Sequence, residues 1–309
     1  MEKRKIRVSV ICTAYNHEKY IAKALDGFVN QKTDFRYEVI VHDDASTDGT
    51  VAIIREYEKR YPDIIRGIYQ TENQYSKGIR IMDDIIYPEI TGEYVALCEA
   101  DDYWINDNKL QMQVDFLDRN PSYSAVTHNS IFKDEKNSNE WVQYQQDNDE
   151  KLNFKKLIID GGKCYHTSSL MLRKEHYLYP EDFRIKNIGD YPRSVYLSLV
   201  GDIYYFKEPM SVHRVNVEGS WTQKNASVNK LIETLSMKNQ FLVVVDEYTK
   251  KEHHKYIKDL KRSNEAEKMI LTDDYWSYIF RYFDVFFRKP FSYQKYIIKQ
   301  LLKSVLKGN

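Results

Sequence analysis

The sequence has few cysteines, no surplus of charge of either sign and no long apolar run. The 309 residues include 46 Lys and Arg and 46 Asp and Glu, so no global charge selects nucleic acid as a partner. Cys12, Cys98 and Cys164 are odd in number, lie far apart and form no CxxC pair. This usage argues against a disulfide framework or a zinc site and fits a reducing compartment.

The sequence also lacks the apolar segments that direct a chain to or through a membrane. No apolar stretch follows the charged residues 1–5, so we expect no signal peptide. No run approaches the roughly 20 apolar residues of a membrane span. These absences predict a cytoplasmic protein, and they leave open a peripheral attachment at the inner face of the membrane. The oligomeric state is open as well, and a homo-oligomer is one alternative.

The strongest feature that is present is an acidic segment behind an apolar strand. Residues 94–98, Tyr-Val-Ala-Leu-Cys, predict a buried strand, and Glu99, Asp101 and Asp102 follow it directly. Crowded carboxylates repel one another, and a divalent cation such as Mg²⁺ or Mn²⁺ would remove that conflict. A solvated acidic loop before the next helix is the alternative reading of this segment.

Strands and helices alternate over the first 130 residues. We expect strands at residues 8–13, 37–42, 64–69, 94–98 and 124–128, and helices at 18–30, 46–61 with Ser46 as N-cap, 79–88 and from 110 onward. This order predicts parallel strands with crossover helices. Ligands bind beyond the carboxyl ends of such strands, where polar residues 15–16, 43–44 and 99–102 would meet.

The remaining chain continues this pattern less regularly. Residues 133–150 predict an exposed loop, and residues 168–173 and 203–206 predict further strands. Asp190 and Pro192 open an expected helix that ends near Val200. From residue 225 onward the pattern is helical, and the end is strongly basic.

Several polar residues in these positions suit particular chemistry. Asp43 and Asp44 could accept hydrogen bonds from a nucleobase or a ribose, and Tyr15 could stack on the base. Asp190 would be held in a fixed lead-in before a helix, as a general base requires. The alternatives are an ordinary turn cap for the first pair and simple charge complementarity at a helix N-terminus for Asp190.

A last polar group contains His213, Arg214 and Trp221. An arginine or a histidine could neutralise a diphosphate, and the tryptophan could cover a sugar. His128 and His166 also stand beside polar residues, although a lone histidine is more often structural.

Four of these segments, taken in order, resemble family 2 glycosyltransferases of the GT-A fold. Residues 9–17 (Ser-Val-Ile-Cys-Thr-Ala-Tyr-Asn-His) resemble the opening of the family, and residues 43–50 (Asp-Asp-Ala-Ser-Thr-Asp-Gly-Thr) are similar to its nucleotide-binding signature. Residues 99–104 (Glu-Ala-Asp-Asp-Tyr-Trp) look like its DXD motif, with Glu first. Residues 189–192 (Gly-Asp-Tyr-Pro) are similar to the Gly-Asp-Trp-Pro segment that carries the base in a branch building capsule, O-antigen and lipooligosaccharide.

The resemblance implies an α/β protein with a mixed, mainly parallel Rossmann-like sheet flanked by helices, and a C-terminal helical extension. It also implies inverting transfer of a sugar from a nucleotide donor to a glycan or lipid-linked acceptor, with Mn²⁺ or Mg²⁺. The donor of this family is usually UDP-linked. Asp190 would be the catalytic base, and Asp101 and Asp102 would hold the metal. The nucleotide would be bound by Thr13, Ala14, Tyr15, Asn16, Glu18, Asp43, Asp44, Lys77, Glu99, Ala100 and Asp101. The acceptor or sugar site would include Trp104, His166, Thr167, Arg214 and Trp221.

Two departures from the family pattern concern the metal and phosphate contacts. Glu99 replaces the usual first Asp of the motif. Asn216 stands where the branch often has a histidine, for which His213 could substitute. A metal-dependent nucleotidyltransferase and a non-catalytic sugar- or nucleotide-binding module are the rival functions. A Gly-rich or basic phosphate loop after the first strand would favour the nucleotidyltransferase, and residues 15–18 do not provide one.

The predicted domains are a catalytic domain over residues 1–222 and a helical region over residues 223–309. The basic residues of its tail are Arg281, Arg288, Lys289, Lys295, Lys299, Lys303 and Lys307. Two apolar faces are expected, one with Ile279, Phe283, Phe286 and Phe287 and one with Ile297, Leu301 and Val305. Such a helix would lie on an anionic membrane surface or, alternatively, pack on the catalytic domain.

Overall fold

The computed structural model describes residues 5–143, 148–160, 164–217, 227–288 and 291–306. The chain forms two compact units. The first contains Met1–Tyr179 and Arg193–Glu218, and the second contains Pro180–Pro192 and Gly219–Asn309. The second unit therefore includes a segment, Pro180–Pro192, that the sequence had assigned to the catalytic domain.

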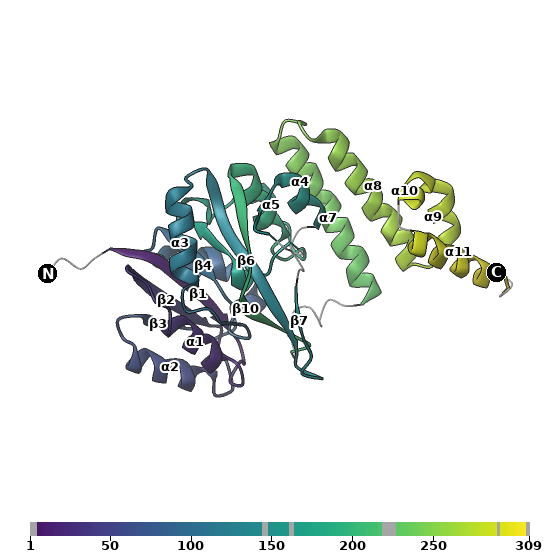
Figure 1. Cartoon of the computed structure of the whole chain (residues 1–309). Helices are drawn as coiled ribbons and strands as arrows, with labels where there is room; N and C mark the ends of the chain where they lie inside the picture. Colours follow the sequence, from purple (N-terminus) through teal and green to yellow (C-terminus); the bar gives the residue numbers. More distant parts are fainter. Residues whose placement is uncertain (1–4, 144–147, 161–163, 218–226, 289–290, 307–309) are drawn as a thin grey trace. The chain divides into compact units, whose positions relative to one another are not determined.

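A single mixed sheet organises the first unit (Figure 1). Its strands lie in the order β3-β2-β1-β4-β9-β6-β10-β5, with β7 paired to β6 and β8 to β10. They span β1 (Ile6–Ala14), β2 (Arg36–Asp43), β3 (Ile65–Tyr69), β4 (Tyr94–Leu97), β5 (Tyr103–Trp104), β6 (Tyr123–Asp134), β7 (Glu140–Val142), β8 (Glu150–Leu152), β9 (Met171–Arg173) and β10 (Asp202–Val215). The predicted α/β fold with a mixed, mainly parallel sheet is confirmed.

Helices cover both faces of the sheet, so β1, β2 and β4 are buried on both sides. In β1, Val8 and Val10 join one apolar core and Ile11 joins the other, as alternation along a strand requires. The first core is completed by α1 (Ile21–Val29), α2 (Thr50–Arg60) and α3 (Lys109–Arg119). The second contains side chains of α4 (Phe154–Asp160) and α5 (Tyr191–Val200) and of the turns η2 (Ile81–Ile86) and η3 (Tyr87–Glu89).

The middle of the sheet differs from a simple parallel order. Strand β9 runs antiparallel between β4 and β6, whereas β6 and β10 pair in parallel. Strand β10 is much longer than the predicted 203–206, and its register shifts around Pro209, where the ladder lacks an N–H donor. Part of the predicted strand 168–173 is the 3₁₀ turn η5 (Thr167–Ser169). The predicted loop 133–150 contains β7.

Two predicted helix starts are wrong by several residues. Helix α2 begins at Thr50 with Gly49 as its N-cap. The Ser46 hydroxyl does not cap it and instead accepts the backbone N–H of Asn16. Helix α1 begins at Ile21 rather than near residue 18, after a turn that the His17 carbonyl closes.

The second unit is mainly helical in its described residues from 227 onward. It contains α7 (Val228–Tyr248), α8 (His254–Leu271), α9 (Tyr275–Arg281), α10 (Phe283–Arg288) and α11 (Phe291–Leu306). Tyr278, Phe286, Ile297 and Leu301 belong to one buried cluster of this unit. The predicted shared face of Ile279, Phe283, Phe286 and Phe287 is wrong, because the helix breaks at Tyr282 and changes phase, leaving Phe283 and Phe287 exposed.

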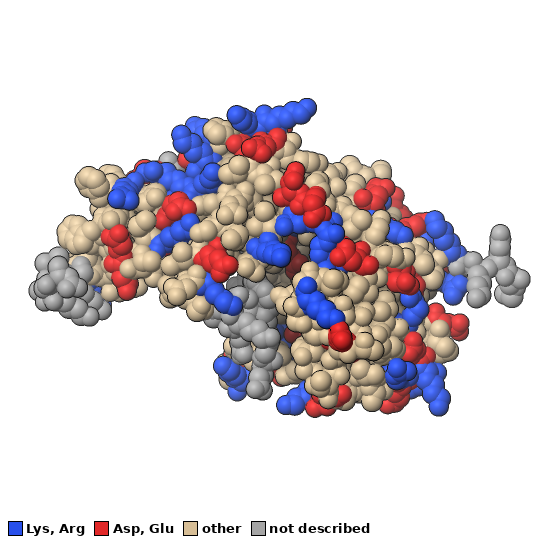
Figure 2. Space-filling model, turned by 180° about the vertical axis from the view of Figure 1, so that it is seen from behind, with Lys and Arg blue, Asp and Glu red and all other residues tan. Residues whose placement is uncertain are grey.

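The surface agrees with the balanced composition. Figure 2 shows acidic and basic side chains intermingled on one face of the molecule. Among the described residues, no helix is both long enough and apolar enough to cross a bilayer.

Candidate active site

The acidic segment after β4 is held against the carboxyl end of β1. Beyond the strand pairing, the N–H of Cys98 donates to the carbonyl of Ile11 at 3.0 Å, and the N–H of Ala100 donates to that of Thr13 at 3.1 Å. Asp43 ends β2 opposite Ala14 of β1. The structure therefore brings the polar residues that follow β1, β2 and β4 to one edge of the sheet, as predicted.

A short strand then carries the acidic segment to the far end of β10. Tyr103 and Trp104 form β5, which pairs antiparallel with Val212 and Ser211 of β10. This pairing places Asp102 beside the next residue of β10, His213. Sequence reasoning did not predict β5, since two residues are too few to show a period.

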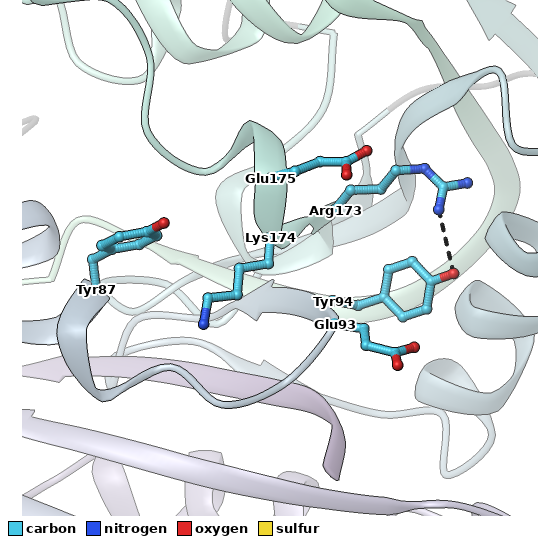
Figure 3. Close-up of a pocket in the computed structure, with 6 residues that line it drawn as sticks. All are labelled: Tyr87, Glu93, Tyr94, Arg173, Lys174 and Glu175. Atoms are coloured by element: carbon cyan, nitrogen blue, oxygen red, sulfur yellow. Dashed lines mark hydrogen bonds between the residues drawn. The ribbon is translucent and has the colours of Figure 1, made fainter. Parts of the chain in front are cut away.

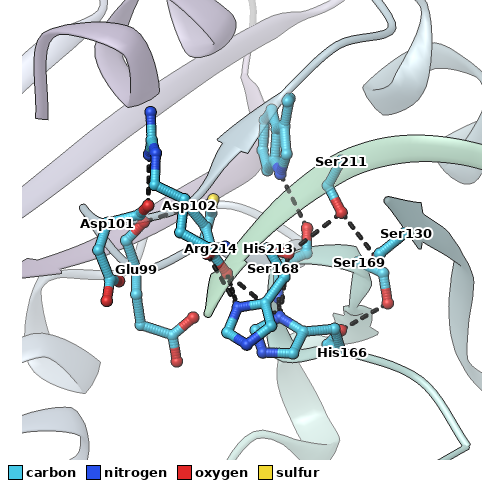
Figure 4. Close-up of polar contacts among 12 residues, drawn as sticks. Glu99, Asp101, Asp102, Ser130, His166, Ser168, Ser169, Ser211, His213 and Arg214 are labelled. Carbon is cyan, nitrogen blue, oxygen red and sulfur yellow. Dashed lines mark hydrogen bonds and ion pairs between the residues drawn. The ribbon is translucent and has the colours of Figure 1, made fainter. Parts of the chain in front are cut away.

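Asp102 is the centre of a buried polar cluster (Figure 4). Its carboxylate lies 3.0 Å from Nδ1 of His213 and 3.2 Å from Nδ1 of His166, and it accepts the backbone N–H of Arg214 at 3.0 Å. The two imidazole rings stack with centroids 3.5 Å apart. Asp102, His166 and His213 each offer one ligand atom, and these atoms lie within 4.8 Å of one another. The arrangement could hold a metal ion.

The neighbouring carboxylates differ in their electrostatics. Burial opposes ionisation of Asp102, but the imidazoles of His213 and His166 outweigh it and hold the pKa of Asp102 well below its usual range. The pKa of Asp101 is raised, first by burial and then by the charge of Asp102. Asp101 is thus a carboxylate that a bound cation would stabilise in its charged form.

Arg214 is engaged by protein groups around this segment. Its side chain donates to the carbonyl of Asp101 and forms an ion pair with Glu135 at 3.2 Å. The guanidinium also lies over the rings of Tyr103 and Tyr20. These contacts favour a role in positioning the acidic segment, and a contact with sugar stays a prediction. Glu135 and Tyr20 were not identified from the sequence.

The loop after β1 and the loop after β2 are joined by side-chain hydrogen bonds. The Asn16 amide oxygen accepts the N–H of Thr47, and the Glu18 carboxylate accepts the N–H of Gly49, both at 2.8 Å. Asn16 has a positive φ of 58°. Tyr15 is 44% exposed, so its ring is accessible to a base, whereas Asn16 and Glu18 fix the loops that surround it.

The two aspartates after β2 are buried and already hydrogen-bonded to the protein. The Asp44 carboxylate accepts the N–H groups of Gln74 and Tyr75, at 2.7 and 3.1 Å. Asp43 accepts the N–H of Ser46. Asp44 therefore anchors the loop after β3, and direct contact of either carboxylate with a nucleotide stays a prediction.

The other predicted site residues have mixed positions. The prediction that Trp104 contacts sugar or acceptor is corrected. Its side chain is 4% exposed, packs on Phe28 and donates its Nε1–H to the carbonyl of Ser168, so it belongs to the core. Lys77 pairs with Glu72 at the surface. Thr167 follows His166 in η5. Trp221 lies outside the described residues.

Asp190 lies directly before α5 and is exposed. The helix begins at Tyr191, so Tyr191 is helical although a residue before proline favours an extended conformation. Asp190 belongs to the second unit and the acidic segment belongs to the first. Its role as a base stays a prediction.

A separate cavity lies at the opposite ends of the strands (Figure 3). Its wall includes Tyr94, the first residue of β4, and Arg173, the last residue of β9. The Arg173 guanidinium is hydrogen-bonded to the carbonyls of Tyr123 and Leu117, so its charge stabilises the fold there. This cavity is not part of the site at the carboxyl ends.

The family model of glycosyl transferase family 2 matches residues 9–177. That range covers more than half of the chain and includes β1, β2 and the acidic segment. The chain belongs to glycosyl transferase family 2.

Individual relatives agree with this assignment. The uncharacterized protein Rv1520 of Mycobacterium tuberculosis is 34% identical over 74% of this chain and 64% of its own length. The Staphylococcus aureus TarS structure in complex with UDP superposes with a TM-score of 0.57, at 16% identity, over 85% of this chain and 72% of that one. The Pyrobaculum calidifontis mannosyltransferase PcManGT, in complex with GDP-Man and Mn²⁺, has a TM-score of 0.50 at 18% identity and covers 100% of this chain and 89% of its own.

The identity and the coverage of these matches limit what they establish. At these identities the two solved structures establish the GT-A fold alone. The chain spans about two thirds or less of the curated relatives that it matches, 64% in the case of Rv1520.

Proposed function

We propose that this protein transfers a sugar from a nucleotide donor, UDP-linked, to a glycan or lipid-linked acceptor with inversion at the anomeric carbon. The observation that carries the proposal is the cluster of Asp102, His166 and His213 at the edge of the sheet where the acidic segment and the loops after β1 and β2 meet. The family membership of the chain supports the reaction class.

The donor atoms of the cluster suit a divalent cation. Asp102, with His166 and His213, would hold it, and Asp101 would turn its carboxylate to the same ion. Carboxylate oxygens suit both Mg²⁺ and Mn²⁺, and the imidazole nitrogens favour Mn²⁺ of the two. The bound ion would neutralise the charge of the departing nucleoside diphosphate as a Lewis acid.

The chain's own residues would position the two substrates. The loops joined by Asn16 and Glu18 would form the nucleotide site, with Tyr15 against the base. Asp190 would accept the proton of the acceptor hydroxyl as that hydroxyl attacks the anomeric carbon. A single in-line displacement inverts the configuration there.

The relatives support a nucleotide-sugar donor for the proposed reaction. TarS is described as a poly(ribitol-phosphate) beta-N-acetylglucosaminyltransferase, and its solved structures contain UDP and UDP-GlcNAc. For this chain we propose a UDP-sugar donor and a role in bacterial capsule, O-antigen or lipooligosaccharide synthesis. For these substrates we propose a reaction in the cytoplasm, at the inner face of the membrane.

A screen for nucleotide release tests this function. The full-length chain is incubated with a panel of nucleotide sugars, with and without Mn²⁺, and the products are identified by mass spectrometry. Release of UDP that depends on Mn²⁺ is expected for at least one donor. Release of a sugar 1-phosphate with transfer of the nucleotidyl group would indicate a nucleotidyltransferase instead, and binding without any turnover across donors and acceptors would indicate a binding module.

A variant pair connects that result to the cluster. Asp102→Asn should weaken Mn²⁺ binding, measured by electron paramagnetic resonance, because it removes a charged ligand. Asp107→Asn is the matched control, since Asp107 lies in the loop after β5 and pairs with Lys32. Equal Mn²⁺ affinity of both variants would refute the metal site.

A further inference from the structure

Helices α9, α10 and α11 carry exposed apolar side chains that their own core does not use. Phe280 is 89% exposed, and five others are between 46% and 61% exposed. The six side chains are those of Trp276, Phe280, Phe283, Phe287, Ile298 and Leu302. The core of this unit is formed by other residues of the same helices, among them Tyr278 and Ile297. An apolar surface beyond the core indicates an interaction site.

Basic side chains share one helix face with two of these apolar ones. Lys295, Ile298, Lys299 and Leu302 are all exposed and lie at i, i+3, i+4 and i+7 of α11, which is one helical face. Arg281 is exposed at the end of α9. We call these three cations and the six apolar residues the aromatic–basic surface.

The acidic residues of these helices are occupied by other contacts. Asp284 forms an ion pair with Arg262 at 2.8 Å. Asp274 caps α9 by accepting the N–H of Ser277 at 3.1 Å, and Asp273 accepts the hydroxyl of Tyr275 at 2.7 Å. The charged residues that belong to the aromatic–basic surface are Arg281, Lys295 and Lys299, so the charge of this surface itself is positive.

This combination matches the interface of an anionic bilayer. Aromatic rings are enriched at the level of the lipid headgroups, and lysine can lay its aliphatic stem along apolar groups while its ammonium reaches phosphate. Amphipathic helices with basic flanks lie in the plane of such interfaces. No described helix of the chain could span the bilayer, so contact would be with one leaflet.

A second copy of this chain is a poorer partner for the surface. A twofold contact would bring the same patch of both copies together, so the positive charges of Arg281, Lys295 and Lys299 from both copies would lie in one interface. Like charges opposed in that way weaken association. We propose that the aromatic–basic surface docks the protein on an anionic lipid bilayer. This inference does not depend on the sugar transfer proposed above.

Vesicle flotation with the full-length chain tests the apolar part. Vesicles of phosphatidylglycerol and phosphatidylcholine in equal parts are compared with vesicles of phosphatidylcholine alone. The chain should bind the anionic vesicles, and the double variant Phe280→Ser, Phe283→Ser should lower the partition constant roughly tenfold. The control Ile159→Ser, Val243→Ser removes two exposed apolar side chains elsewhere, on α4 and α7, and should bind like the parent.

A second pair of variants tests the charge. Lys295→Gln, Lys299→Gln should weaken binding to anionic vesicles severalfold, and added salt should reduce the difference from the parent. Lys255→Gln, Lys258→Gln removes two exposed lysines of α8 and is the matched control. Circular dichroism and sedimentation velocity, recorded for every variant, establish the helical content and the oligomeric state.

Three results would overturn the proposal. The first is equal binding to neutral and anionic vesicles. The second is a loss of binding that is as large in the control variants as in the surface variants. The third is a parental chain that ignores vesicles and forms a dimer that Phe280→Ser, Phe283→Ser dissociates, which would make a second copy the occupant.

Discussion

Lys109 is a fully buried ammonium group directly behind the acidic segment. Its Nζ lies 4.0 Å from the ring centroid of Trp104 and donates to the Gln113 amide oxygen at 2.7 Å. Burial lowers the pKa of Lys109 to about 7, because no carboxylate compensates for the water that the ammonium loses. The residue begins α3.

The lowered pKa predicts a stability that depends on pH. In the unfolded chain lysine titrates near 10.4, so between about pH 7 and pH 10.4 the unfolded state binds more protons than the native state. The free energy of unfolding should therefore rise with pH across this window, and the cost of the buried charge is complete below pH 7. Lys109→Met removes this dependence.

Urea unfolding of Lys109→Met and the parent, from pH 6 to pH 10, measures the effect. The variant should gain most relative to the parent at pH 6, by a few kcal/mol, and the gain should shrink toward pH 10. The exposed Lys59→Met is the control and should leave the profile of the parent unchanged. A gain that is constant over the pH range would show that Lys109 binds as many protons in the native as in the unfolded state, so that burial does not lower its pKa.

Asp190→Asn separates a catalytic role from a capping role. The amide keeps the size of the side chain but removes its basicity, so transfer should fall by roughly 10²–10⁴. UDP-sugar affinity should stay nearly unchanged because the base acts on the acceptor. Capping by Asn is about as good as by Asp, so a purely structural Asp190 predicts parental transfer.

Asp182→Asn is the control for this experiment. Asp182 is also exposed in the segment Pro180–Pro192 and should leave the rate unchanged. A large loss in Asp182→Asn combined with parental transfer by Asp190→Asn would move the role of base to Asp182.

The elements that the sequence predicted best are the strands with buried faces on both sides. Residues 37–42 and 94–98 read as strands because most of their positions are apolar, and β2 and β4 contain them almost entirely. The pattern does not reveal partners far away in the chain. That β9 inserts between β4 and β6 depends on tertiary pairing of three residues, which carries no local period.

The same limit applies to the candidate site. The acidic segment and the loops after β1 and β2 could be found because each is a contiguous motif. His166 and His213 could not be joined to Asp102 from the sequence, since each is a single histidine in a different place, directly before η5 and within β10. The pairing of β5 with β10 is what brings them together.

The hydrogen bonds between the loops after β1 and β2 predict how the stabilities of two Asn16 variants should rank. Asn16→Gly keeps the positive φ but removes the acceptor of the Thr47 N–H, at a cost of about 1 kcal/mol. Asn16→Ala loses the acceptor and also strains the backbone at φ 58°, which should cost about 1 kcal/mol more. Urea unfolding at one pH compares the three proteins, and an alanine variant as stable as the glycine variant would contradict the strain.

At the scale of the whole molecule, the two units each contain a core of their own. The sequence predicted the change from the α/β pattern to a helical one near residue 223, and the division of the structure at Glu218 and Gly219 lies close to it. It did not predict that Pro180–Pro192 joins the second unit. Nothing in its local pattern distinguishes it from the loops of the first unit, because its assignment depends on tertiary contacts such as those of Phe183 with Phe241.

If the nucleotide site is built by the first unit, ligand should stabilise that unit through mass action. UDP with Mn²⁺ at about 100 times the dissociation constant adds about 2.7 kcal/mol to the free energy of unfolding. For a unit of this size the midpoint should rise by roughly 5–10 °C. Differential scanning calorimetry of the full chain measures this shift, and Asp102→Asn should abolish it if the metal is required.

A core variant of the second unit tests whether that unit is needed for the stabilisation by UDP and Mn²⁺. Ile297 is fully buried among helices α8 to α11, so Ile297→Ala should destabilise that unit by about 2–5 kcal/mol. It should nevertheless keep the shift that UDP and Mn²⁺ produce, because the loops joined by Asn16 and the cluster around Asp102 belong to the first unit. A shift lost in Ile297→Ala would mean that nucleotide binding requires the folded second unit. The first unit alone would then not account for the site.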